Sequence, residues 1–273
     1  MVCDICPNAC DIASGGVGAC LARGAGVVPL GYGRLTSLAL DPVEKKPLYH
    51  FHLGSMVLSA GSFGCNLRCP WCQNHGISMI GHKEAEAYGL HNVSPEELAD
   101  MAERHAAYGN IGVAFTYNEP LINFEYVMDT SRILKGRGLK SVLVTNGYAN
   151  PGRFKELLPY VDAMNIDLKS INEGFYEKIG GRLDIVQENI RAAASRCHVE
   201  LTCLLIDGEN DTEEEMEAMA EFVASVSRDI PLHISRFFPH YRMEDRAATD
   251  LGSMRRFEAI AQRRLTYVHL GNV

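Results

Sequence analysis

The sequence predicts an α/β protein: a parallel sheet that closes fully or partly into a barrel, preceded by a small cysteine-rich cap. Short apolar runs alternate with helical patterns six times from residue 56 onward. Crossover helices of this kind return the chain to the same edge of the sheet, so successive strands run parallel. The first fifty residues break this alternation and are rich in Gly and Cys, which indicates a metal-stabilised cap.

Six apolar segments are the expected strands, and one more strand is expected near the end of the chain. The six are Met56–Ser59, Ile111–Phe115, Ser141–Thr145, Ala163–Asp167, Val199–Leu205 and Leu232–Ser235, and the last is Thr266–Leu270. Three helix starts are clear: Ser94 and Glu97 form a capping box, Asn150 precedes Pro151, and Thr212 and Glu215 form another capping box. In such a fold the active site lies at the carboxyl ends of the strands.

Length and composition fit one large α/β domain with a small appendage. The chain has 273 residues, of which 47% are hydrophobic and 22% charged. We expect the cap at residues 1–50 and the barrel at residues 51–273. The formal net charge of −8 disfavours a broad nucleic-acid or membrane surface. Because no apolar run spans a bilayer and the N-terminus lacks a signal-peptide pattern, we expect a soluble, cytoplasmic protein.

Seven of the nine cysteines lie in two short stretches, which in a cytosolic protein indicates metal binding rather than disulfides. The second stretch follows the first expected strand and contains Cys65, Cys69 and Cys72. Thiolates are the usual ligands of iron–sulfur clusters, and three of them leave one iron of a [4Fe–4S] cluster open. Zinc held together with His75, or buried structural thiols, are the alternatives. The position of the loop at a strand end favours the cluster.

The first stretch contains Cys3, Cys6, Cys10 and Cys20 and offers four soft ligands. Four thiolates fit a second iron–sulfur cluster and a structural zinc ion, so the spacing leaves both possibilities open. Four protein ligands would leave no open metal position, and the role of this centre would then be structural or electron-transferring.

The cysteine loop, with Trp71 directly before its last cysteine, resembles the radical SAM superfamily. More narrowly, the chain resembles the radical SAM enzyme of the AmmeMemoRadiSam system, whose members are often described as similar to the pyruvate formate-lyase activating enzyme. The likeness covers nearly the whole chain and rests on segments such as 46–51, 116–120 and 270–273. It implies a partial (β/α)6 barrel of the TIM type, with a [4Fe–4S] cluster and S-adenosylmethionine (SAM) at its open top.

The resemblance also implies which residues hold SAM. They are Trp71 beside the cluster, Asn118 and Glu119 after the second expected strand, Thr145 and Asn146 after the third, and Asp167 and Lys169 after the fourth. Glu119 suits the ammonium group of SAM. The superfamily has Gly-Gly before this acid, where this chain has Tyr117 and Asn118, so backbone contacts differ there. Plain turns or an exposed ion pair would produce the same patterns without a ligand.

The sixth expected strand carries His233 and Arg236, which we expect to bind substrate at the opening of the barrel. A buried, hydrogen-bonded histidine is the alternative interpretation of His233.

The expected reaction is reductive cleavage of SAM to methionine and a 5′-deoxyadenosyl radical, followed by hydrogen abstraction from a substrate. A one-electron donor such as ferredoxin or flavodoxin would supply the electron. The first substrate hypothesis is a protein or peptide, and the second is a small molecule. A non-catalytic iron–sulfur or zinc scaffold is the hypothesis from another class.

Overall fold

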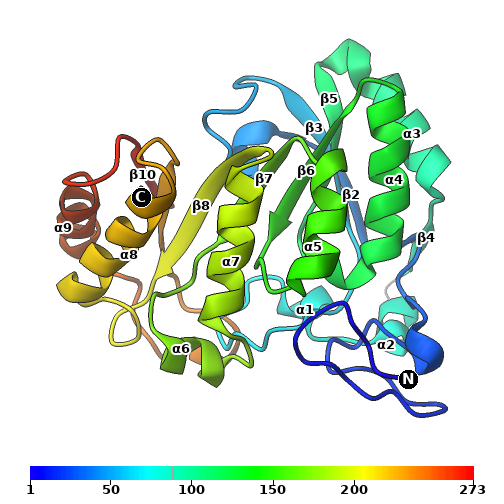
Figure 1. Cartoon of the computed structure of the whole chain (residues 1–273), viewed down its shortest axis with the longest axis horizontal. Helices are drawn as coiled ribbons and strands as arrows, with labels where there is room; N and C mark the ends of the chain where they lie inside the picture. The colour runs from blue at the N-terminus through cyan, green and yellow to red at the C-terminus, as the bar shows by residue number, and fades with distance from the viewer. Residues whose placement is uncertain (88) are drawn as a thin grey trace.

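A computed structural model describes residues 1–87 and 89–273. Its main feature is an eight-stranded sheet in the order β10-β9-β8-β7-β6-β5-β3-β2. Neighbouring strands from β3 to β10 run parallel, and β2 pairs antiparallel with β3 at one edge. Figure 1 shows the curved sheet with helices packed on one side. The predicted α/β class with a parallel sheet is confirmed, and β2 and β10 are the two edges of a partial barrel.

Each expected strand is present with bounds shifted by at most two residues. These strands are β3 (Met56–Gly61), β5 (Asn110–Phe115), β6 (Lys140–Thr145), β7 (Ala163–Asp167), β8 (His198–Leu205), β9 (Leu232–Arg236) and β10 (Val268–Gly271). The strand β2 (Ser37–Pro42) lies inside the segment assigned to the cap and was not predicted. An antiparallel edge strand needs one buried face only, so β2 lacks the continuous apolar run of the parallel strands.

Helices cover one face of the sheet, and the main hydrophobic core lies between the two layers. They are α1 (His75–Ser78), α2 (His82–Ala87), α3 (Pro95–Arg104), α4 (Phe124–Gly136), α5 (Pro151–Leu157), α6 (Glu173–Lys178), α7 (Leu183–Ala194), α8 (Glu213–Val226) and α9 (Leu251–Ala261). Short 3-10 turns occupy Ala25–Val27, Val43–Lys45, His105–Tyr108, Pro120–Asn123, Leu158–Tyr160 and Tyr241–Met243.

Two helix starts test the capping predictions. At α3, Ser94 Oγ accepts from Glu97 N, and Glu97 Oε2 accepts from Ser94 N, so that capping box is confirmed. At α8, Thr212 Oγ1 accepts from Glu215 N at 3.1 Å. The Glu215 carboxylate does not return to Thr212, because it accepts from Ser170 Oγ and from the backbone N–H of Ile171 instead. The second capping box is therefore wrong in its reciprocal half.

The opposite face of the sheet, the helix-free face, has two parts. Apolar residues of four strands form a separate cluster there and are covered by Val43 and Leu48. Beyond this cluster, side chains on the same face are only half-buried although their strands lie inside the sheet. They are Val144, Asp167, Thr202, Leu204 and Ser235. Because residues two apart share a face of a strand, these positions define a continuous surface open to solvent.

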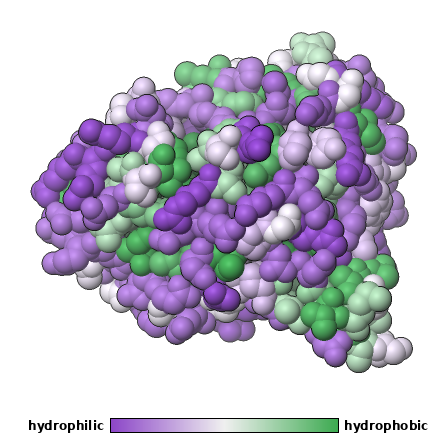
Figure 2. Space-filling view, viewed as in Figure 1, coloured by the Kyte–Doolittle hydropathy of each residue, from purple (hydrophilic) through white to green (hydrophobic). Residues whose placement is uncertain are grey.

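The segment 1–33, called here the cysteine lobe, precedes the first strand, β1 (Arg34–Leu35), which pairs with β4 (His91–Asn92). In Figure 1 the lobe lies near α1 and α2, at the lower right. Figure 2 shows apolar residues gathered over the same corner, where Val2, Val17 and Val28 are each at least half exposed. In the described part of the chain, no helix has the length and apolarity needed to cross a membrane.

Candidate active site

Three free cysteines lie on the loop that leaves the carboxyl end of β3, the three-thiol loop. Cys65 and Cys72 are half-buried, and Cys69 is buried. Burial raises the pKa of all three thiols, that of Cys69 to about 11. Thiols of this kind stay protonated at neutral pH unless a metal binds them and takes the place of the proton.

The environment of Cys65 supplies hydrogen bonds to its sulfur. The backbone N–H of Leu67 lies 3.4 Å from Cys65 Sγ, and Asn146 Nδ2 lies 3.7 Å from it. Asn146 Nδ2 also donates to Asn66 Oδ1 at 2.9 Å, which connects the loop to the end of β6. Donors to ligand sulfurs are among the features by which proteins tune iron–sulfur clusters.

At the end of β5, Asn118 braces the three-thiol loop. Its Oδ1 accepts from Ser62 N at 2.9 Å, and its Nδ2 donates to the carbonyl oxygens of Phe63 and Gly64 at 3.1 Å each. Tyr117, the residue before it, has a φ of 71°, the left-handed conformation that glycine adopts most easily. The tyrosine thus adopts a conformation that is uncommon for a residue with a side chain.

Glu119 is 3% exposed and joins the ends of β5 and β6. Its Oε1 accepts from Thr145 Oγ1 at 2.7 Å and from Leu121 N at 2.9 Å, and its Oε2 accepts from Asn146 N at 2.8 Å. Burial raises the pKa of Glu119 to about 7, and these three hydrogen bonds offset only part of the rise. A carboxylate offers about four acceptor positions, so one position on Oε2 is still unused.

The end of β7 brings an ion pair next to the loop. Lys169 Nζ lies 2.9 Å from Asp167 Oδ2, and both side chains are half-buried. Burial alone would lower the pKa of Lys169, but the charge of Asp167 and its hydrogen bond to Lys169 raise the pKa above its usual value. The lysine is therefore cationic beside the loop. Trp71 is buried and packs on Phe175 with ring centroids 5.3 Å apart, so it forms an apolar wall of the loop.

The structure separates His233 from Arg236. His233 Nε2 lies 2.6 Å from Glu200 Oε2, inside the sheet and away from the three-thiol loop. Arg236 ends β9, where its Nε donates to the carbonyl of Thr249 at 2.7 Å and its guanidinium lies over Phe238. Of the two expected substrate residues, Arg236 alone lies at the carboxyl end of its strand, and His233 takes the buried, hydrogen-bonded position that was its alternative interpretation.

Sequence reasoning missed Glu200, which is fully buried at the centre of a polar network. Its Oε1 accepts from His50 N and His198 Nε2, and its Oε2 accepts from Tyr49 N and His233 Nε2, over 2.6 to 3.0 Å. Burial would raise its pKa, but the hydrogen bonds from His198 and His233 lower it to about 2. The segment Lys46–Phe51, called here the floor segment, is thereby fixed across the helix-free face. A lone acid within an apolar strand was the signal available in the sequence.

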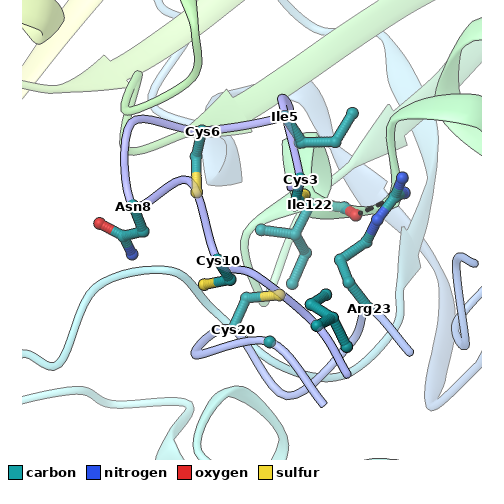
Figure 3. A pocket seen from close by; sticks show the side chains of 10 residues that line it. Cys3, Ile5, Cys6, Asn8, Cys10, Cys20, Arg23 and Ile122 are labelled. Atoms are coloured by element: carbon teal, nitrogen blue, oxygen red, sulfur yellow. Dashed lines mark hydrogen bonds between the residues drawn. The ribbon is translucent and has the colours of Figure 1, made fainter. Parts of the chain in front are cut away.

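The cysteines of the lobe, Cys3, Cys6, Cys10 and Cys20, line one pocket, the four-cysteine pocket (Figure 3). Its other walls include Ile5, Ile12, Arg23 and Ile122. All four cysteines are free thiols, and Cys10 is the half-buried member of the set. The structure thus brings together side chains that span positions 3 to 20 of the sequence.

His75 does not complete a zinc site with the three-thiol loop. Its ring stacks on Tyr241 with centroids 4.4 Å apart. Among the described residues, no group of three or more His, Cys, Asp or Glu side chains is arranged to hold a metal ion. A [4Fe–4S] cluster spreads its thiolate ligands over different irons and fits a more open set of sulfurs than a single ion does.

A parallel α/β sheet with three free thiols after its first parallel strand, and buried charged groups at the next strand ends, defines a class of enzymes that bind an iron–sulfur cluster. The family follows from comparison: the model described as the Radical SAM superfamily matches residues 61–223, and the chain belongs to this superfamily. The superfamily and the enzyme class predicted from the sequence are confirmed, and membership implies a [4Fe–4S] cluster and SAM.

Two relatives illustrate the range of similarity. An uncharacterized protein of Methanocaldococcus jannaschii is 37% identical over 99% of this chain and 81% of its own length. The pyruvate formate-lyase-activating enzyme of Clostridium pasteurianum is 31% identical over 44% of this chain and 48% of its own length. The matched region therefore covers about half the length of that activating enzyme.

Solved structures support the fold. A domain of a pyruvate-formate lyase-activating enzyme from Bacteroides vulgatus aligns over 59% of this chain and 98% of its own, with a TM-score of 0.51 and 21% identity. A radical SAM methyltransferase from Sphaerobacter thermophilus aligns over 79% of this chain and 66% of its own, with a TM-score of 0.57 and 18% identity.

The residues present fit the groups that the family implies. The three-thiol loop offers three free sulfurs, two of them half-buried, and N–H donors to Cys65. Glu119 has an unused acceptor position for a cationic group, and Lys169 offers a cation for an anionic one. The chain thus has three sulfur ligands for the cluster. Glu119 and Lys169 carry groups of opposite charge that suit the ammonium and the carboxylate of the methionine part of SAM.

Proposed function

We propose that this radical SAM enzyme removes a hydrogen atom from a protein or peptide substrate. When bound, the cluster supplies the electron that breaks the S–C5′ bond of SAM, which yields methionine and a 5′-deoxyadenosyl radical. The observation that carries the proposal is the meeting of the three-thiol loop with the ends of β5, β6 and β7 beside an open helix-free face.

The residues of the site divide into those that bind and those that position. We assign Cys65, Cys69 and Cys72 to three irons of the cluster. Glu119 receives the SAM ammonium at its unused acceptor position, which would also stabilise its ionised form. Lys169 pairs with the SAM carboxylate, and Asp167 accepts from the ribose hydroxyls.

The remaining predicted residues act through these groups. Thr145 and Asn146 hold the Glu119 carboxylate, and Asn118 holds the three-thiol loop. Trp71 keeps water from the side of the loop where it packs on Phe175. Holding the reacting groups in place and excluding water is the contribution that a protein makes to radical chemistry.

The open part of the helix-free face supports a polypeptide as substrate. Five inward positions on four neighbouring strands keep partial exposure, which leaves access for an extended segment. Arg236 is the last residue of β9, and its guanidinium offers a cation to a backbone carbonyl or a carboxylate of the substrate. The similarity to the Clostridium pasteurianum activating enzyme, whose printed name describes action on pyruvate formate-lyase, supports the same substrate class.

An isotope experiment tests the substrate class. The anaerobic enzyme is incubated with dithionite, SAM and a fully deuterated cell extract that has been separated into macromolecules and small molecules. We expect 5′-deoxyadenosine in both cases and deuterium in that product only with the macromolecular fraction. Deuterium transfer only from the small molecules would instead support a small-molecule substrate, and a complete lack of 5′-deoxyadenosine would support a scaffold.

The proposal includes partners and a second centre. A one-electron donor such as ferredoxin or flavodoxin would reduce the enzyme. The four-cysteine pocket would hold either a second iron–sulfur cluster or zinc. Free thiols at all nine cysteines suit a reducing compartment, which supports the cytoplasm as the location.

A further inference from the structure

The four-cysteine pocket lies directly against the three-thiol loop. The carbonyl oxygen of Cys20 accepts from the backbone N–H of Cys65 at 3.1 Å. The two chain segments are so close that a Cβ atom at Gly64 would lie 2.4 Å from the same oxygen. A glycine with a φ of 81° is therefore needed at position 64. A backbone hydrogen bond thus joins Cys20 of the four-cysteine pocket to Cys65 of the three-thiol loop.

Two buried amides make a second connection between the sets. Asn8, which lines the four-cysteine pocket, donates from its Nδ2 to the carbonyl oxygen of Asn66 at 3.3 Å. Asn66 Oδ1 accepts from Asn146 Nδ2 at 2.9 Å, and the same nitrogen lies 3.7 Å from Cys65 Sγ. Because Asn66 and Asn146 are both buried, the path from the pocket wall to Cys65 Sγ runs through protein rather than through water.

One residue of the pocket wall has an unused hydrogen-bond donor. Arg23 lines the pocket and is 2% exposed, and its terminal nitrogens are bound to Glu125 and to the carbonyl of Ile122. Its Nε is buried with no hydrogen-bond partner among the described residues. A buried N–H without an acceptor is costly. An anionic metal centre in the pocket would also lie beside the positive charge of this arginine.

The contact between the two cysteine sets favours a cluster over a zinc ion in this pocket. Figure 3 shows the four cysteines around one pocket. In a [4Fe–4S] cluster each thiolate binds a different iron, so four thiolates complete the cluster. Zinc takes the same four ligands but has no redox chemistry. A centre that touches the three-thiol loop can exchange electrons with it only if it is a cluster.

We propose that the four-cysteine pocket holds a [4Fe–4S] cluster that relays electrons to the catalytic cluster, an inference that rests on the proposed function. A low-potential one-electron carrier, such as reduced flavodoxin, is oxidised by one electron and reduces the relay cluster. The relay cluster then passes that electron to the oxidised cluster on the three-thiol loop and returns to its own oxidised state. No bond is broken and no proton moves in this step.

The test compares two reductants on one pair of variants. The double variant Cys3→Ala/Cys10→Ala empties the pocket, and it spares Cys20, through which the backbone contact to the three-thiol loop runs. The matched control is Cys197→Ala, a cysteine outside both sets. Iron and zinc are counted by mass spectrometry, and 5′-deoxyadenosine formation is measured with dithionite and, separately, with reduced flavodoxin.

We expect about eight irons in the wild type and the control, and about four in the double variant, because each cluster holds four. With reduced flavodoxin, product formation by the double variant should fall at least about tenfold, and with dithionite it should stay within about twofold. Zinc together with about four irons in the wild type, or equal rates with flavodoxin, would overturn the relay. Failure of the wild type to form product with dithionite would overturn the proposed function instead.

A spectroscopic measurement on the wild type keeps the proposal testable if the double variant does not fold. Two reduced clusters held by neighbouring chain segments couple magnetically and split each other's electron paramagnetic resonance signals. We expect such splitting in the fully reduced protein, and its loss in the variant Cys65→Ala/Cys69→Ala/Cys72→Ala. A single unsplit signal in the fully reduced wild type would overturn the relay.

Discussion

Glu119 and Glu200 are both buried acids on the same sheet, yet their surroundings shift their pKa values in opposite directions. Glu200 accepts four hydrogen bonds, two of them from histidines, and its pKa is lowered to about 2 against the effect of burial. Glu119 accepts three hydrogen bonds from neutral groups, and burial raises its pKa to about 7. Burial penalises the ionised form of both acids, so the number and the kind of hydrogen-bond partners decide the direction of the pKa shift.

The difference separates a structural acid from one that awaits a ligand. The Glu200 network is complete and fixes the floor segment across the helix-free face. Among the described residues, the hydrogen-bond partners of Glu119 include no cation, and Glu119 lies beside the free thiol of Cys65, as a site that gains its last partner from a cofactor would. Predictions that exchange or remove these partners therefore test whether the two ends of the sheet have these separate roles.

The largest effect is expected at the three-thiol loop. Cys69→Ala removes one of three cluster ligands, and formation of 5′-deoxyadenosine with dithionite and SAM should be lost completely. The fold should persist, because Cys69 is a small buried side chain in a loop. Product is measured by chromatography and folding by circular dichroism. Cys197→Ala is the control, and normal product formation by Cys69→Ala would contradict the cluster assignment.

The next largest effect is expected on the stability of the fold, when Glu200, which holds the floor segment, is changed. Glu200→Gln replaces an acceptor for four donors by an amide with a single acceptor oxygen, and should lower the free energy of unfolding by about 3–5 kcal/mol. The affinity for SAM, measured at low temperature, should be unchanged. The wild type should lose stability as the pH falls from 4.5 toward 2, because the lowered pKa stabilises the fold only while Glu200 is ionised. If the free energy of unfolding of Glu200→Gln fell equally steeply between pH 4.5 and 2, another group would be responsible for this pH dependence.

Tyr117 connects the three-thiol loop with the floor segment, and a change at Tyr117 should have an intermediate effect on stability. Its carbonyl accepts from Asn74 Nδ2 at 2.7 Å near the loop, and its hydroxyl donates to Asp41 Oδ2 at 2.7 Å. Asp41 also binds Lys46, the first residue of the floor segment. Tyr117→Phe removes one hydrogen bond to a charged acceptor and should cost about 1.5–3 kcal/mol. Chemical denaturation measures it, and Tyr49→Phe, which keeps the backbone contact to Glu200, is the control.

The strands and the three-thiol loop could be predicted from sequence because their signals are local. Cys65, Cys69 and Cys72 lie within eight positions, and each parallel strand is a short apolar run. The acid Glu200 stands out within an apolar strand, but its hydrogen-bond network could not be predicted, because its partners Tyr49 and His50 lie about 150 residues away and meet it only in the folded chain. His233 was predicted to lie at the opening of the barrel. It precedes Arg236 by three residues of strand, or about 10 Å, so it lies inside the sheet and not at the carboxyl end of the strand.

The smallest expected effect, and the sharpest test of the comparison, is the pH dependence at Glu119. Its raised pKa means that the folded protein without SAM favours the protonated acid, so its contribution to stability is present at low pH and is lost as the pH rises through 7. Binding of the SAM ammonium has the opposite sign, since it requires the carboxylate. The affinity for SAM should therefore weaken about tenfold from pH 8 to pH 6.

The variant Glu119→Gln isolates the contribution of the Glu119 charge to the affinity for SAM. The amide has nearly the same shape but no charge, so the variant should bind SAM about tenfold more weakly at pH 8 and show no change down to pH 6. Isothermal titration at several pH values measures both quantities, with Glu125→Gln, an acid outside the site, as the control. If Glu119→Gln kept the pH dependence of the wild type, the incomplete network around Glu119 would be structural like that of Glu200, and the contrast between the two acids would not mark the SAM site.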